Sequence, residues 1–353
     1  MPISPFPRRA GRRGAAPLAA LLCAACAAPP PGPPPTPTTM PPGTDFCQAA
    51  AQRDAPPRAL AFAAAAQGEH AAWGASSLDA EGRLLASGAY EAEDVPRIDG
   101  LAPWQRVMAY WQAVDPDARR LPYVVRHGAL RPADRGRLRE ALAQAGSERL
   151  QGLGAGPDQG LSPQEQDALA AALDRVAVVD TPWSAAFVSW LARQAGLRDG
   201  EFAFSEAHAD YAGAAWAATQ AEQAGQAAPH ALRACDLART PPRVGDLVCQ
   251  SRGADAGLDR FGTLVPALAA RAAGGAPVPM HCDVVVQVDE QGFDAIGGNV
   301  LQSVTQRRLL FAPGTRRLDP SYLDGSGCTP GTPGCIDRHM SRQPWSLLLQ
   351  WRE

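Results

Sequence analysis

Near Pro241, after an alanine-rich helix that is expected to end at about Ala224, the sequence changes from helix-like to strand-like patterning, and this change predicts an α+β fold. In the segment 103–111, apolar residues recur at the i, i+3, i+4 and i+7 positions of an amphipathic helix, and Ser162-Pro163 is typical of a helix start. Beyond residue 240, β-branched and apolar runs favour short strands, and the turn at 290–292 predicts a hairpin. The sequence therefore predicts helices first and an antiparallel sheet after them.

The stretch 181–194 predicts a helix with a serine in its first turn. Thr181 suits the N-cap, Pro182 suits the first helical position, and Gly196 suits the stop. Ser184 then lies among unpaired backbone N–H groups at the positive end of the helix dipole. A nucleophile for acyl transfer benefits from this position, because those N–H groups can stabilise an oxyanion. The alternative is that Ser184 is only a small residue at a helix start.

The N-terminus has the pattern of an export signal. Four arginines between residues 8 and 13 precede an apolar run to Ala28, which is too short to span a membrane. Small residues directly before Cys26 favour a lipoprotein cleavage site with Cys26 as the lipid acceptor, although Cys23 stands where an aliphatic residue is usual. The alternative is an ordinary signal peptide cut near Ala28. The lipoprotein interpretation predicts a membrane-anchored protein of the cell envelope, facing the periplasm and held at the outer membrane.

An exported chain is expected to form disulfides. Six cysteines remain besides Cys23 and the lipid acceptor, and six cysteines allow 15 pairings. Cys328 and Cys335 bracket a turn-rich segment and predict one disulfide. Cys235 and Cys249 flank a Pro-Pro turn and predict a second, whereas the pairing of the remaining two, Cys47 and Cys282, stays open. The spacing supplies no second pair of zinc ligands, so neither a metal nor another cofactor is predicted.

Four features of the second half resemble the papain-like CHAP and NlpC-type amidases. The segment 183–187 (Trp-Ser-Ala-Ala-Phe) resembles their nucleophile motif, with Ser184 in place of cysteine. A Pro-x-x-Gly-Asp strand entry at 242–246, His281 at a strand start and Asn299 follow in the same chain order. The resemblance covers about residues 181–304. It implies a papain-like fold in which Ser184 is the nucleophile, His281 the base and Asn299 the orienting residue.

A second resemblance covers more of the chain, from about residue 103 to the C-terminus. Five segments resemble the bacterial family catalogued as domain of unknown function 2272, which implies no established reaction. The segments are Trp-Ser-Ala-Ala-Phe (183–187), Phe-Ser-x-x-His-x-x-Tyr (204–211), Gly-Asp-Leu-Val-Cys (245–249), His-Cys-Asp-Val-Val (281–285) and Gly-Gly-Asn-Val (297–300).

These patterns predict four segments along the chain. They are a lipoprotein signal peptide (1–25), a proline-rich linker (26–45), a mainly helical N-terminal portion (46–178) and a papain-like catalytic-type domain (179–353). Residues that are candidates to line the substrate cleft are Trp183, Ser205, His208, Tyr211 and Asp283.

Each site residue also has a structural interpretation. His208 follows a natural N-cap, Ser205, and either lines a cleft beside Ser184 or packs in the core. His281 is alternatively a strand-end histidine satisfied by backbone groups, and Asn299 a turn residue after two glycines. Because His281 and Cys282 are adjacent in a strand, only one of them can face Ser184.

A serine nucleophile needs a base. The helix dipole is worth ~0.3–1 kcal/mol, up to ~2 kcal/mol, which is too little to ionise a hydroxyl. Ser184 can attack only if a histidine takes its proton during the reaction. We therefore predict hydrolysis of an amide in peptidoglycan stem peptide by a Ser-His-Asn arrangement.

Two other functions keep the same cleft. One is an inactive amidase-like fold that binds cell-wall peptide or a protein partner, and the other is an acyltransferase that uses the same Ser-His pair. Whether the chain is an enzyme stays open at this point. With 33 basic and 36 acidic residues, the chain has no charge excess that favours nucleic acid.

Overall fold

The computed structural model describes residues 44–97, 99–114, 162–179, 181–252, 257–322 and 341–352 without 342, together with residues 140, 144 and 148. All of these residues belong to one compact unit that begins at Met40. The predicted signal peptide, Cys26 and nearly all of the proline-rich linker lie outside the described residues. Cys328 and Cys335 lie outside them as well, so their predicted disulfide stays a prediction.

Helices make up most of the described N-terminal portion. The described helices are α1 (Thr44–Ala51), α2 (Pro57–Ala72), α3 (Pro103–Val114), α6 (Pro163–Val178), α7 (Ser184–Gln194), α8 (His208–Gln223), α9 (Phe261–Ala272) and the 3-10 helix Pro320–Tyr322. The predicted start of α6 is confirmed, because Ser162 and Glu165 form a capping box. The predicted buried face of α3 is also confirmed at Trp104, Val107 and Trp111. In the described part of the chain, no helix is long and apolar enough to cross a membrane.

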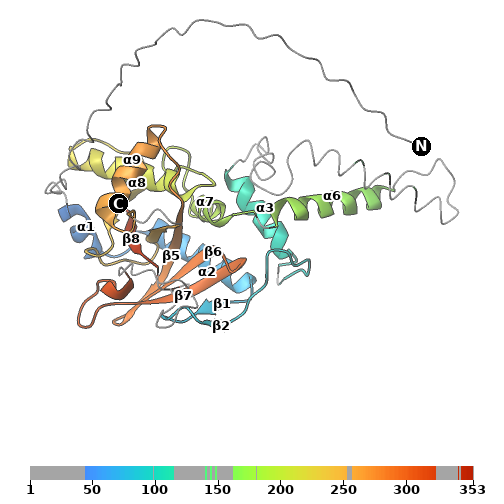
Figure 1. Cartoon of the computed structure of the whole chain (residues 1–353), viewed down its shortest axis with the longest axis horizontal. Helices are drawn as coiled ribbons and strands as arrows, with labels where there is room; N and C mark the ends of the chain where they lie inside the picture. The colour runs from blue at the N-terminus through green and yellow to red at the C-terminus, as the bar shows by residue number, and fades with distance from the viewer. Residues whose placement is uncertain are drawn as a thin grey trace, which may run out of the picture. The chain divides into compact units, whose positions relative to one another are not determined.

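The strands form one sheet in the order β2-β1-β7-β6-β5-β4-β8-β3. Every neighbouring pair is antiparallel except β1 with β7, so the predicted α+β class with an antiparallel sheet is confirmed in outline. Figure 1 shows β5, β6 and β7 side by side, with β1 next to β7. The strands are β1 (Ser76–Leu78), β2 (Leu84–Ala86), β3 (Leu232–Asp236), β4 (Leu247–Ser251), β5 (Met280–Val288), β6 (Gly292–Val300), β7 (Ser303–Leu310) and β8 (Trp345–Trp351).

The helical portion and the strand portion share this sheet. The strands β1 and β2 precede α3 in the chain, yet β1 is hydrogen-bonded to β7. The helices α2 and α7 pack against β5 and β6. Apolar residues from both portions therefore form one hydrophobic core, which includes Phe62, Trp183 and Val284.

Two predicted N-caps are wrong by two residues. Trp183 is the N-cap of α7 and Ala207 is the N-cap of α8, and neither side chain caps its helix. The hydroxyl of Thr181 instead donates to the Ala177 carbonyl at the end of α6, at 3.0 Å. Ser205 accepts from the Ala207 N–H at 3.0 Å, which supports the turn before α8. Each hydroxyl therefore hydrogen-bonds to a backbone group outside the helix that it is predicted to cap.

The described disulfides join Cys47 to Cys235 and Cys249 to Cys282. The predicted Cys235–Cys249 pair is therefore wrong. Its two cysteines lie on β3 and β4, and β8 lies between these strands in the sheet. Cys249 instead stands directly opposite Cys282 on the neighbouring strand β5, which places the two sulfurs in bonding range.

The predicted strand entry at 242–246 fixes several elements to one another. Asp246 accepts from the N–H groups of Arg243 and Trp351 at 2.9 and 3.0 Å, while the Arg243 guanidinium donates to the Ala50 carbonyl at 3.0 Å. Gly245 has φ +89°, and a Cβ there would lie 2.3 Å from the Ala59 carbonyl oxygen. Glycine is needed at this position because the backbone is left-handed and α2 approaches closely.

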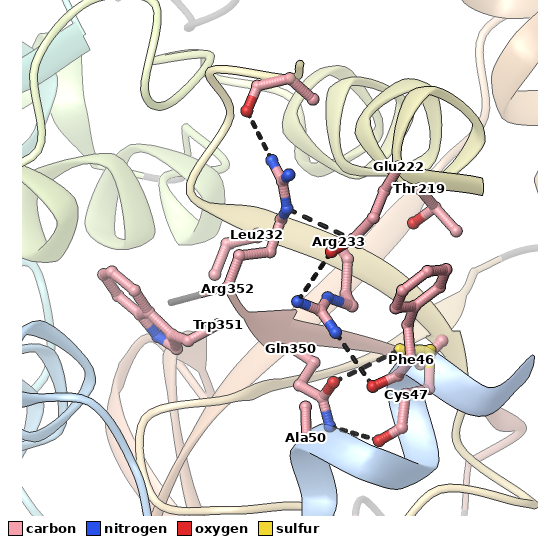
Figure 2. A network of polar contacts seen from close by, with 12 residues as sticks. Phe46, Cys47, Ala50, Thr219, Glu222, Leu232, Arg233, Gln350, Trp351 and Arg352 are labelled. Atoms are coloured by element: carbon pink, nitrogen blue, oxygen red, sulfur yellow. Dashed lines mark hydrogen bonds and ion pairs between the residues drawn. A yellow bond between two sulfur atoms is a disulfide. The ribbon is translucent and has the colours of Figure 1, made fainter. Parts of the chain in front are cut away.

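A second polar network holds α1 and α8 at the β3–β8 edge of the sheet (Figure 2). Glu222 on α8 pairs with Arg233 on β3 at 3.1 Å, and its other oxygen lies 3.6 Å from the Arg352 guanidinium. Arg233 also donates to the Phe46 carbonyl at 3.0 Å, beside the Cys47–Cys235 disulfide. The C-terminal end of α8 is thereby fixed, which also limits where its first residue, His208, can lie.

Candidate functional site

Ser184 is the first residue of α7 and its side chain contacts His208. The Ser184 Oγ lies 2.7 Å from His208 Nε2, within hydrogen-bond distance, and both residues are almost completely buried, at 6% and 5% exposure. The first N–H groups of a helix have no partner within it, so Ser184 lies beside several backbone donors. The hydroxyl, the imidazole and the helix N-terminus together form the geometry expected of a serine nucleophile with a base.

His208 is the first residue of α8, and its other ring nitrogen is also hydrogen-bonded. Tyr211 lies one turn later on the same face of α8, and its hydroxyl contacts His208 Nδ1. Burial holds the pKa of His208 well below its usual value, and electrostatic interaction with His281 and Arg252 lowers it further. The ring is therefore neutral at pH 7, which is the state a general base requires.

Behind His208 lies a buried charged cluster formed by His281, Asp283 and Arg307. His281 Nε2 lies 2.7 Å from Asp283 Oδ1, and Arg307 Nε lies 2.6 Å from Asp283 Oδ2. His281 and Asp283 are two residues apart on β5, so their side chains point to the same side of the strand. The rings of His281 and His208 are 5.3 Å apart, centroid to centroid.

The charges in this cluster determine which groups are ionised. Burial alone raises the pKa of Asp283, but the positive charge of Arg307 and the interaction with His281 outweigh it, so the net pKa is lowered. Burial lowers the pKa of His281 to about 4, although Asp283 opposes that shift. At pH 7 the cluster therefore holds an Asp283 carboxylate between the Arg307 guanidinium and a neutral His281.

Two consecutive glycines of β6 make room for these side chains. A Cβ on Gly297 would lie 1.9 Å from Asp283 Oδ1, and a Cβ on Gly298 would lie 2.7 Å from the Phe187 side chain of α7. Residue 297 must therefore be glycine for Asp283 to reach its place beside His281. Residue 298 must be glycine for α7 to approach β6 this closely.

The structure brings together some of the predicted site residues and separates others. The ring in contact with Ser184 is His208, and the partner of His281 is Asp283 rather than Asn299. Asn299 is half-buried and has φ +55°, in a register irregularity of β6 between Gly297 and Val300. At this irregularity, Asn299 departs from the regular alternation of side chains between the two faces of the strand.

Two other residues predicted to line the substrate cleft, Trp183 and Ser205, make structural contacts instead. Trp183 is completely buried, stacks on Trp73 with ring centroids 5.2 Å apart, and donates to Glu91. Ser205 donates to Asp210 at 2.6 Å and supports the start of α8. Trp183 therefore belongs to the core beneath Ser184, whereas Ser205 positions the helix that carries His208 and Tyr211.

Sequence reasoning missed Arg307. This arginine lies in β7 opposite Ala295 and is 2% exposed, and its guanidinium also lies over the Trp345 ring at 5.2 Å. Arg307 is one of two adjacent arginines in a largely polar strand, which by itself does not indicate a buried charge, and only the order of the strands in the sheet places it against Asp283. Within the described residues, no group of three His, Cys, Asp or Glu side chains has metal-binding geometry.

The fold and site define an α+β protein with a serine-histidine pair at a helix N-terminus. The sequence model of the bacterial family DUF2272, described as an uncharacterized protein conserved in bacteria, matches residues 152–351, and the chain belongs to this family. The sequence motifs predict a resemblance from about residue 103, whereas the family model matches only from residue 152. No curated protein and no solved structure matches the chain.

Proposed function

We propose that this protein is an acyl hydrolase in which Ser184 is the nucleophile and His208 the general base. The observation that carries the proposal is the 2.7 Å contact between Ser184 Oγ and His208 Nε2 at the start of α7. In this proposal His208 takes the role that the sequence assigned to His281, because His208 is the ring in contact with the hydroxyl. Asn299 has no part in the proton transfer.

The reaction proceeds in two balanced steps. His208 Nε2 accepts the proton of Ser184 as Oγ bonds to the carbonyl carbon, and the resulting oxyanion is stabilised by the N–H groups of the first turn of α7. His208 then returns the proton to the leaving amine as the C–N bond breaks. Water hydrolyses the acyl-serine by the same proton transfers, which regenerates both side chains.

The substrate that we propose is an amide of peptidoglycan stem peptide. Support comes from the chain order of a nucleophile helix followed by an antiparallel sheet, which is similar to papain-like CHAP and NlpC-type amidases. The packing of α7 on β5 and β6 agrees with that order. A papain-like topology is part of the proposal.

A fluorophosphonate probe tests the nucleophile. We expect covalent labelling of the folded wild-type protein on the peptide that contains Ser184, and no labelling of Ser184→Ala, measured by mass spectrometry of the digest. Purified peptidoglycan should release peptide products with wild type only. Absence of both signals in folded wild type would favour the alternative of an inactive fold that binds cell-wall peptide.

We also propose that the mature protein is anchored in the cell envelope, at the outer membrane, through lipid on Cys26. The basic and apolar pattern of residues 8–28 supports this location. Cells fed an alkyne-bearing fatty acid should incorporate it into the wild-type protein and not into Cys26→Ala. Unlabelled wild type recovered in a soluble periplasmic fraction would contradict the anchor.

A further inference from the structure

The hydrogen-bond chain through His208 can run in only two directions. His208 makes two contacts, Nε2 with the Ser184 oxygen and Nδ1 with the Tyr211 oxygen. Ser184 and Tyr211 each carry one hydroxyl proton, and the neutral imidazole carries one N–H proton. Either Ser184 donates to Nε2 and Nδ1–H donates to Tyr211, or Tyr211 donates to Nδ1 and Nε2–H donates to Ser184. Only the first direction leaves a lone pair on Nε2 for the serine proton.

The electric field at Ser184 favours the first direction. Ser184 lies at the N-terminus of α7, an eleven-residue helix whose positive end attracts the lone pairs of Oγ. The hydroxyl proton is repelled from the same end and points away from the helix. His208 Nε2 is the acceptor in contact with it.

The Tyr211 hydroxyl is suited to be the acceptor that the first direction requires. Tyr211 is fully buried, and burial raises the pKa of its hydroxyl well above the usual value, with the negative charges of Asp283 and Asp210 adding to the rise. The hydroxyl therefore keeps its proton. A phenol that keeps its proton still carries lone pairs on its oxygen, and His208 Nδ1 is the group in contact with that oxygen, so Nδ1–H can donate to it.

We propose that Tyr211 is the positioning residue that holds His208 as its Nδ1-protonated tautomer. This inference rests on the proposed function for its catalytic meaning, because the tautomer makes Nε2 the base. A neutral phenol performs the role that a carboxylate performs in a Ser-His-Asp triad. A second carboxylate here would place another negative charge near Asp283 in a buried site.

Nitrogen NMR of protein labelled with 15N-histidine measures the tautomer without reference to activity. The chain has six histidines, and the His208 signals are assigned by their loss in His208→Gln. We expect Nδ1–H in wild type and, in Tyr211→Phe, a mixed or Nε2-protonated ring. Labelling by fluorophosphonate should fall about 10- to 100-fold in Tyr211→Phe through the rate constant rather than probe affinity.

Tyr322→Phe is the matched control. The Tyr322 hydroxyl is also buried, accepts from the Leu310 N–H and donates to the Ala80 carbonyl, so its loss costs stability without touching His208. We expect its His208 tautomer and its labelling rate to equal those of wild type. An Nε2-protonated His208 in wild type, or an unchanged tautomer in Tyr211→Phe, would overturn the inference. If Ser184 is not labelled but the Nδ1–H of His208 still depends on Tyr211, the proposed hydrolase activity is overturned and the positioning role of Tyr211 is kept.

Discussion

Replacing His208 is expected to reduce fluorophosphonate labelling of Ser184 by about 100- to 10,000-fold, which is the usual contribution of a general base. The physical reason is that the hydroxyl is a poor nucleophile until Nε2 removes its proton, and His208 Nε2 is in contact with it. His208→Gln is the preferred variant, because glutamine fills much of the buried space that alanine would leave empty. The measurement is the second-order labelling rate constant at pH 7.

His281→Gln is the control for this experiment. His281 is equally buried but its Nε2 lies against Asp283, so its loss should lower labelling by less than about tenfold while lowering stability. Far-ultraviolet circular dichroism would verify that both variants are folded. Equal loss of labelling in the two variants would contradict the special role of His208, and a larger loss in His281→Gln would assign the base to His281.

The second large effect concerns stability at acid pH. The pKa of His281 is lowered to about 4 by burial, whereas an unfolded histidine has a pKa of 6.5. Between these values the unfolded state binds more protons than the native state, so stability is complete above pH 6.5 and is lost as the pH falls toward 4. The loss from this one group is about 3 kcal/mol of unfolding free energy at pH 4, from the difference of the two pKa values.

Comparison with His281→Gln isolates this contribution. Asp246 acts in the opposite direction, because burial raises its pKa to about 6 and its stabilising effect is lost as the pH rises from 3.8 to 6. His208, whose pKa is also lowered by burial, acts in the same direction as His281, so the wild-type curve alone mixes several groups. Urea unfolding at pH 7 and pH 4 should show that the stability difference between wild type and His281→Gln shrinks by about 3 kcal/mol on acidification. A difference that is independent of pH would mean that the pKa of His281 is the same in the native and the unfolded state, which would contradict the lowered value.

The charged cluster of His281, Asp283 and Arg307 thus has a supporting part in the proposed mechanism. It holds a carboxylate near Tyr211 and a second imidazole near His208, and it contacts neither Ser184 nor its oxyanion donors in the described structure. Breaking a buried ion pair costs about 3–5 kcal/mol. Variants of Asp283 and Arg307 should therefore be judged by stability as well as by reaction rate.

The sequence determined the elements whose signals are local. The capping box at Ser162, the apolar face of α3 and the hairpin between β5 and β6 all follow from residues within a few positions of one another. The same holds for a serine at the start of a helix, which the segment 181–187 specifies by itself. Family membership was also readable from short motifs spread over the second half of the chain.

Only the tertiary structure decided which residues meet across those elements. Whether His208 or His281 reaches Ser184 depends on where the first residues of α8 and of β5 lie relative to the start of α7, and no local pattern sets either. Cys235 and Cys249 are kept apart by β8, which enters the sheet between β3 and β4, and Cys249 meets Cys282 because β4 and β5 are neighbours. Arg307 reaches Asp283 across β6 only because residue 297 is a glycine. Contacts between residues distant in sequence depend on sheet order and helix packing, which are properties of the whole fold.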